Sequence, residues 1–199
     1  GGHYLQGSTD ITRTVAIGEA GQVEKEHFTL VVRAMLRLAS TIFLHGCSGT
    51  NLDCIAREVF WKKGLNFNHG TGHGVGYLLN IHEGPINFRW KEGERPAPAL
   101  EENMVITDEP GIYIEGSHGI RLENELLVRK TVKNEYGQFM NFEILTYVPI
   151  DLDAILPEKM STEEKEMLNH YHKQVYEKVS PYLSEEERIW LKEYTRAVK

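Results

Sequence analysis

The sequence DEPGIYIEGSHGIRLEN, residues 108–124, joins two apolar runs through a polar, glycine-containing turn. The pattern predicts a β-hairpin that turns near Gly116. Glu109 and Glu123 both lie seven residues from Gly116, so this hairpin would place them opposite each other. Opposed carboxylates repel each other unless a cation lies between them. Arg121 shares the face of Glu123. The alternative is an exposed hairpin with ordinary surface charges.

Upstream of this hairpin, two histidines lie among glycines in HGTGHGVG, residues 69–76. Because glycine disfavours helix, the stretch predicts a loop or bulged strand rather than a helical pair of metal ligands. The pattern leaves open which of His69 and His73 binds a metal and which contacts substrate or relays a proton. His82 adds a third imidazole after an apolar run, and its alternative is a structural histidine at a strand end.

Asp10 lies in GSTDITRT, residues 7–14, and an isolated aspartate there is more often a turn former. With His73, Glu109 and Glu123 it makes a set of three carboxylates and one imidazole. Such an oxygen-rich set suits Mn²⁺ or a similar divalent ion better than a thiolate site would. Two ions about 3.5–4 Å apart that share carboxylates would explain why several acids gather in one place.

The composition limits the classes of partner. The chain has 199 residues, the size of one domain, and a formal net charge of −7, which argues against nucleic acid or an anionic membrane surface. Its two cysteines, Cys47 and Cys54, are expected to be reduced thiols of an intracellular protein. No apolar run reaches the roughly 18 residues of a membrane span. The start at Gly1 and Gly2, without a methionine, predicts a chain that begins inside a larger protein.

Hydrophobic periodicity and turn residues predict the secondary structure. Helices are expected over residues 24–43 and 51–63, strands over 12–17, 104–107, 111–114, 120–128 and 139–149, and a surface excursion over 85–100. After Pro149 a helical region follows, opened by the capping boxes Ser161/Glu164 and Ser184/Glu187.

In chain order, HGTGHGVG, HEGP, TDEPGIY and GIRLEN resemble the creatinase/aminopeptidase, or pita-bread, metallopeptidases of family M24. The chain is most similar to the cytosolic type of Xaa-Pro aminopeptidase, with which GSTDITRT and TYVPI also agree. The resemblance implies an α+β pita-bread fold, partial here, with a curved antiparallel sheet and covering helices. Residues 1–150 would be part of the catalytic domain. Residues 151–199 would be a C-terminal helical extension that contributes to a homodimer contact, or alternatively packs on its own domain.

The resemblance also implies roles for individual residues. The family's second aspartate ligand falls on Asp10, its histidine on His73, and its two glutamates on Glu109 and Glu123. The first aspartate would lie two residues before Gly1, so the chain is expected to be an inactive, metal-poor fragment. The substrate and proton-relay histidines fall on His69 and His82, Glu109 is the candidate proton acceptor, and Arg121 is expected to orient a ligand carboxylate or to form a plain hairpin ion pair.

For the intact protein the resemblance implies a cytoplasmic, homodimeric hydrolase with two Mn²⁺ ions per subunit, or alternatively Zn²⁺ or Co²⁺. A metal-activated hydroxide would cleave the N-terminal Xaa-Pro bond of peptides that carry proline at the second position. Two alternatives remain open at this point: a prolidase-like dipeptidase, and a pita-bread binding module without catalysis.

Overall fold

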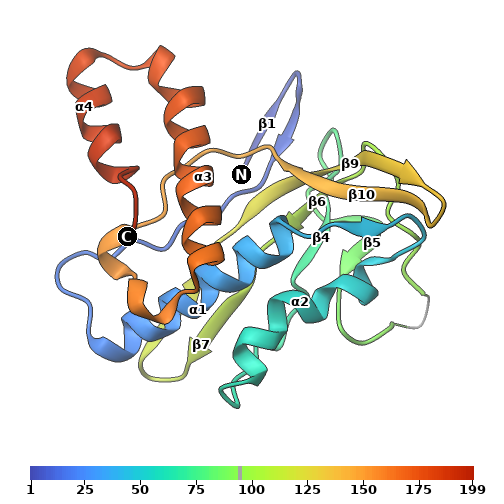
Figure 1. The fold of residues 1–199 in the computed structure, drawn as a ribbon, viewed down its shortest axis with the longest axis horizontal. Helices are drawn as coiled ribbons and strands as arrows, with labels where there is room; N and C mark the ends of the chain where they lie inside the picture. The colour runs from blue at the N-terminus through green and yellow to red at the C-terminus, as the bar shows by residue number, and fades with distance from the viewer. Residues whose placement is uncertain (94–95) are drawn as a thin grey trace.

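The computed structural model describes residues 1–93 and 96–199. A six-stranded sheet in the order β3-β10-β9-β6-β4-β5 forms its centre, and every pair in it is antiparallel. Helices α1 and α2 pack against each other and against this sheet (Figure 1). The helix bounds are Gln22–Ala39 for α1, Gly49–Trp61 for α2, Thr162–Val179 for α3 and Glu185–Tyr194 for α4. The strands of the six-stranded sheet are β3 (Phe43–Leu44), β4 (Gly72–Gly74), β5 (Glu83–Phe88), β6 (Val105–Asp108), β9 (Asn124–Asn134) and β10 (Gly137–Ile144).

The other strands form two ribbons of two strands each. The first pairs β1 (Gly2–Tyr4) with β2 (Gly7–Thr9), and the second pairs β7 (Gly111–Ile114) with β8 (His118–Arg121). The curved antiparallel sheet with covering helices is the α+β architecture that the resemblance implied.

One hairpin register runs through both the central sheet and the second ribbon. Asp108 pairs with Asn124 between β6 and β9, and Gly111 pairs with Arg121 between β7 and β8. Both ladders are therefore centred on Gly116, which has a φ of 71° at the tip. The predicted hairpin is confirmed, but it is interrupted where the chain passes residues 109–110 and 122–123.

The core is continuous from α1 to the C-terminal helices. The face of α1 formed by Val31, Val32, Met35 and Leu38 is fully buried. Side chains of α3, among them Leu168 and Val175, belong to the same cluster. The helical extension therefore packs on the rest of the chain along this face. The capping boxes predicted at the N-termini of α3 and α4 are both present.

Arg13 connects the N-terminal segment to α3. It donates to the side-chain oxygens of Asn124 at 2.7 Å and Tyr171 at 2.5 Å, and to the carbonyl of Glu123 at 2.7 Å. It also donates to the carbonyl of Val148. One guanidinium thus joins the interrupted hairpin, the segment before the extension, and α3.

Three sequence predictions are wrong in detail. Residues 12–17 form no strand, because only Thr12 makes a bridge, to Glu123. Side-chain hydrogen bonds at Arg13, Thr14 and Ala16 hold the segment instead. The first helix ends at Ala39 rather than at residue 43, because Phe43 pairs with Met140 as part of β3. The expected surface excursion over residues 85–100 begins inside the sheet, where Phe88 in β5 is fully buried.

The bulged strand predicted around the two histidines is confirmed. Residues 66–80 contain a short strand, β4, with an irregularity in its pairing after His73. Within residues 1–93 and 96–199, no helix has both the length and the apolar character needed to cross a bilayer.

His172 in α3 is fully buried, and its Nε2 accepts a hydrogen bond from the amide of Ile150 at 3.0 Å. Burial lowers the pKa of His172 to about 4, and the charges of Arg13 and Arg196 act in the same direction. The neutral imidazole is therefore the form that the fold accommodates.

This burial predicts an acid-sensitive contribution to stability. Because the pKa of His172 is lowered in the folded state, its contribution is complete above the unfolded-state value of about 6.5 and is lost as the pH falls toward 4. Between pH 7 and 4.5 the wild-type protein should lose about 2 kcal/mol more unfolding free energy than His172→Gln. Urea denaturation at several pH values measures the difference. His170→Gln, at an exposed position of the same helix, should keep the wild-type slope.

Candidate metal centre

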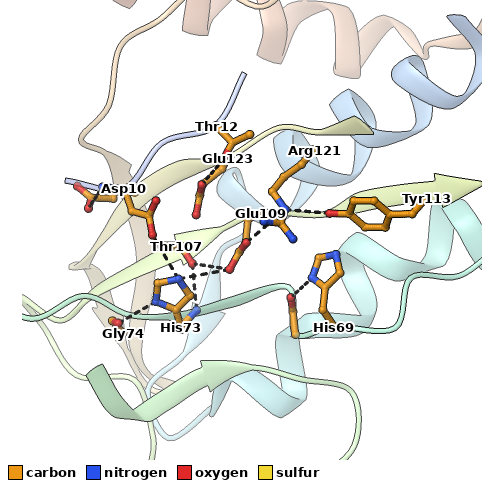
Figure 2. Close-up of polar contacts among 12 residues, drawn as sticks. Asp10, Thr12, His69, His73, Gly74, Thr107, Glu109, Tyr113, Arg121 and Glu123 are labelled. Carbon is orange, nitrogen blue, oxygen red and sulfur yellow. Dashed lines mark hydrogen bonds and ion pairs between the residues drawn. The ribbon is translucent and has the colours of Figure 1, made fainter. Parts of the chain in front are cut away.

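Four candidate ligands from three separate parts of the sequence lie together near strands β4, β6 and β9 (Figure 2). Asp10 follows β2, His73 lies in β4, and Glu109 and Glu123 come from the interruption of the long hairpin. One potential ligand atom each from His73, Glu109 and Glu123 lie within 4.8 Å of one another, and the same holds for Asp10, His73 and His82. His73 belongs to both groups and is therefore the centre of the cluster.

His73 presents one ring nitrogen to the acids. Its Nδ1 donates to the carbonyl of Gly74 at 3.0 Å, so the lone pair of the neutral ring is on Nε2. This Nε2 lies 3.4 Å from Oε1 of Glu109 and 3.5 Å from Oδ2 of Asp10. The amide of His73 donates to Thr107 Oγ1 at 3.0 Å, which fixes the backbone beneath the ring. A neutral imidazole oriented in this way is the form that binds metal ions.

The backbone at the hairpin interruption turns away from its own ladder. The amide of Glu109 donates to the carbonyl of Thr71 at 2.7 Å, and the amide of Glu123 donates to the carbonyl of Thr12 at 3.0 Å. The hydroxyl of Thr12 also donates to Oε2 of Glu123 at 2.6 Å. The amides of Glu109 and Glu123 thus bond to neighbouring segments and not to the opposite strand of the hairpin. The two carboxylates lie close to His73.

Burial makes these acids costly to ionise. Burial raises the pKa of Glu123 to about 7, where the hydrogen bond from Thr12 acts against it and the charges of Glu109 and Asp10 add to it. Burial also raises the pKa of Glu109, against the opposing charge of Arg121. A divalent cation would relieve this electrostatic cost, and three carboxylates with one imidazole are a suitable donor set for a hard divalent ion. The chemistry of these residues therefore fits a divalent metal ion.

His82 lies beside His73, whereas His69 lies beside Tyr113. The ring of His82 is perpendicular to that of His73, with centroids 4.3 Å apart. The ring of His69 meets the edge of Tyr113 with centroids 5.4 Å apart, and its Nδ1 donates to the carbonyl of Gly70 at 2.7 Å. Burial lowers the pKa of His69, and its Nε2 has no hydrogen-bond partner among the residues that the structure describes.

Arg121 lies between Glu109 and Tyr113. Its Nε is 3.6 Å from Oε2 of Glu109 and donates to the hydroxyl of Tyr113 at 2.8 Å. It therefore contacts a candidate ligand carboxylate from the side away from His73 (Figure 2). Both of its partners belong to the same hairpin, so this geometry agrees with an orienting role and with a plain ion pair alike.

Two buried acids near the site were missed by sequence reasoning. Glu125 accepts a hydrogen bond from the amide of Asp10 at 2.7 Å, and burial raises its pKa to about 7. Strand alternation places it on the face of Glu123, so the sequence carried a signal for it. Burial also raises the pKa of Asp108 well above its usual value, and neither carboxylate oxygen of Asp108 has a partner within the described part of the chain. Its place in an apolar strand gave no comparable signal.

The crowded acids predict that a neutral amide at position 123 stabilises the metal-free protein. Because the pKa of Glu123 is raised, its ionisation costs stability as the pH rises from about 4.5 through 7. In the presence of a chelator, Glu123→Gln should therefore raise the unfolding free energy by about 2 kcal/mol at pH 8 and leave it little changed at pH 4.5. Thermal unfolding at both pH values measures this. Glu115→Gln, at the exposed hairpin tip, is the control, and equal effects of the two substitutions would contradict the prediction.

Comparison with known proteins places these features in a family. Residues 1–130 match metallopeptidase family M24, and residues 138–198 match the C-terminal region of peptidase M24. The chain is 41% identical over 203 residues to a probable Xaa-Pro aminopeptidase P of Paracoccidioides brasiliensis (strain Pb03), and covers 33% of that relative. It is 41% identical over 204 residues to a protein of the same name from Talaromyces marneffei, of which it covers 31%. In both matches all of this chain is covered, so it spans about a third of the length of these relatives.

Among solved structures, the chain is similar to X-prolyl aminopeptidase from Caenorhabditis elegans, described as a cytosolic enzyme with a di-nuclear active site. The match has a TM-score of 0.91 and 38% identity, and covers 98% of this chain and 32% of that one. The prolidase from Pyrococcus horikoshii OT3 matches with a TM-score of 0.60 and 33% identity, over 75% of this chain and 39% of that one. Family match, sequence identity and fold agree, and the chain belongs to metallopeptidase family M24.

Proposed function

We propose that the full-length protein is an Xaa-Pro aminopeptidase, which removes the N-terminal residue of peptides with proline at the second position. The observation that carries this proposal is the convergence of His73, Glu109 and Glu123, with Asp10 beside His73. It occurs in an M24 chain whose relatives bear that name. The chain retains all four candidate ligands, which argues against a binding module that has lost catalysis.

Asp10, His73, Glu109 and Glu123 are the proposed ligands of a dinuclear centre. The description of the C. elegans enzyme as di-nuclear supports two ions, and the carboxylate-rich donor set supports Mn²⁺ as their identity, with Zn²⁺ or Co²⁺ as alternatives. Divalent ions bound there would lower the pKa of a water molecule and polarise the scissile carbonyl. Metal analysis of the full-length protein decides which ion is present.

The chain's own residues would supply the remaining chemistry. Glu109, with one oxygen toward His73 and the other toward Arg121, is placed to accept the proton of the attacking water. After the water oxygen adds to the carbonyl carbon, this proton passes to the proline nitrogen as the peptide bond breaks. His69 and His82 would orient the peptide and stabilise the developing oxyanion. Arg121 would hold the Glu109 carboxylate in position.

An aminopeptidase is favoured over a prolidase-like dipeptidase. The likeness to the C. elegans X-prolyl aminopeptidase extends through the C-terminal helices and covers 98% of the chain, whereas the likeness to the P. horikoshii prolidase covers 75%. Residues 138–198 also match the C-terminal region of peptidase M24. We propose a cytoplasmic location, which the description of the C. elegans enzyme as cytosolic supports. We also propose a homodimer, which sedimentation of the full-length protein tests.

The proposed role of Glu109 predicts a large loss of turnover. In the full-length protein, Glu109→Gln should lower kcat for an Xaa-Pro-Xaa peptide by about 10²–10⁴-fold, because proton acceptance and a ligand charge are both lost. Glu115→Gln, which changes an exposed glutamate of the same hairpin, should leave kcat near the wild-type value. Turnover is measured by release of the N-terminal amino acid. Wild-type activity in Glu109→Gln would disprove the assignment.

Substrate length separates the two peptidase alternatives. The full-length protein should cleave an Xaa-Pro-Xaa tripeptide with a higher kcat/KM than the matched Xaa-Pro dipeptide. Competition between the two peptides in one reaction, followed by chromatography, measures the ratio directly. Strict preference for the dipeptide would instead indicate a prolidase.

A further inference from the structure

Helix α2 carries an ion pair that is almost completely removed from solvent. Asp53 is 0% exposed and Arg57 is 1% exposed, one helical turn apart. Arg57 Nε donates to Asp53 Oδ2 at 2.5 Å. Burying two charges is expensive, and a well-packed apolar pair can replace a buried ion pair with no loss of stability. Stability alone therefore does not explain why charges occupy these positions.

The other hydrogen bonds of Arg57 go to residues 66–69, which lead into the glycine-rich stretch. Nη1 donates to the carbonyl of Phe67 at 2.7 Å and to Oδ1 of Asn66 at 3.0 Å, and Nη2 donates to the carbonyl of His69 at 2.6 Å. The guanidinium also lies 3.9 Å from the centre of the Phe67 ring. Arg57 thereby fixes three successive points of the loop that carries His69.

Asp53 binds the same loop on the other side of Gly70. Its Oδ1 accepts a hydrogen bond from the hydroxyl of Thr71 at 2.6 Å. The carbonyl of Thr71 accepts the amide of Glu109 at 2.7 Å. The ion pair is therefore connected to the backbone of His69 through Arg57, and to the backbone of Glu109 through Asp53 and Thr71.

The loop is anchored on both sides of His69, because Phe67 is buried in the core and the amide of Thr71 donates to the carbonyl of Phe88 at 2.8 Å. Gly70 and Gly72 have no side chains to pack, and a Cβ at Gly72 would lie 1.8 Å from the carbonyl oxygen of Thr107. Between those two anchors, the hydrogen bond from Arg57 to the carbonyl of His69 holds the backbone where glycine offers no side-chain packing. A fixed distance between a substrate-binding group and a proton acceptor is a requirement of catalysis.

We propose that Asp53 and Arg57 are positioning residues, which set the place of His69 relative to Glu109. This inference rests on the proposed function. It assigns the pair no contact with substrate or metal, because its hydrogen bonds go to the backbone and side chains of residues 66–71. Loosening the pair should therefore misplace His69 and leave the metal ligands able to bind their ions.

A double-mutant cycle between Arg57 and His69 tests the proposal in the full-length protein loaded with Mn²⁺. Arg57→Met should lower kcat/KM for an Xaa-Pro-Xaa peptide by about 10–100-fold, with metal content unchanged. In the His69→Ala background, Arg57→Met should change kcat/KM by less than about threefold, because the group that it positions is already absent. Equal losses of kcat/KM in the two backgrounds would mean that the pair gives only general structural support, and would overturn the proposal.

The matched control is the ion pair between Arg33 and Glu164, which joins α1 to α3 at 2.9 Å. Arg33→Met should lower the melting temperature while kcat/KM stays within about twofold of the wild-type value. Thr71→Val is a milder variant that removes one hydrogen bond to Asp53, and it should reproduce part of the Arg57→Met loss if that protein folds poorly.

Hydrogen exchange provides a readout that needs no turnover. Amides of residues 66–71 should exchange about tenfold faster in Arg57→Met and Thr71→Val than in the wild-type protein, and should keep the wild-type rate in Arg33→Met. Unchanged exchange in the first two variants would overturn the proposal. A wild-type protein that loads metal but cleaves no Xaa-Pro peptide would refute the proposed function, and the exchange data would still decide whether the pair orders the loop.

Discussion

The structure depends on one interruption in a long β-hairpin. A single register pairs the strands on both sides of it, so Glu109 and Glu123 remain opposite each other although neither belongs to a ladder. Their amides donate instead to the carbonyls of Thr71 and Thr12. This exchange of partners anchors the glycine-rich stretch and the N-terminal segment to the hairpin, and those two segments are the ones that carry His73 and Asp10. Backbone hydrogen bonds thus join the three segments that carry the candidate ligands.

The assembly has an electrostatic cost. Glu109, Glu123 and Glu125 are carboxyl groups whose pKa values are all raised by burial. Such groups oppose folding when they ionise, so the fold holds an arrangement that favours a cation over an empty site. The same burial in a low-dielectric environment strengthens the interaction of these acids with a divalent ion. The same acids therefore favour metal binding and lower the stability of the metal-free fold.

Much of this site follows from the sequence, because hairpin spacing and strand alternation are local rules. The seven-residue spacing of the two glutamates from Gly116 predicts their opposition, and the register confirms it. The interruption itself is not predictable from that spacing, since it depends on Thr12 and Thr71, which are distant in sequence. Residues 12–17 do not form the predicted strand for the same reason. They are held by side-chain hydrogen bonds to residues that are distant in sequence, and they have no neighbouring strand with which to form a ladder. The contacts of Arg57 with residues 66–69 likewise depend on the packing of α2 against the glycine-rich loop.

Arg13 has a consequence for how the protein can be recombined. Its guanidinium binds Asn124, the carbonyl of Glu123 and Tyr171 at the same time. It therefore links α3 to the backbone of a candidate ligand. A chimera that takes its C-terminal helices from another member of the family must carry a phenol at the position of Tyr171, or it will leave this guanidinium without one of its hydrogen-bond partners.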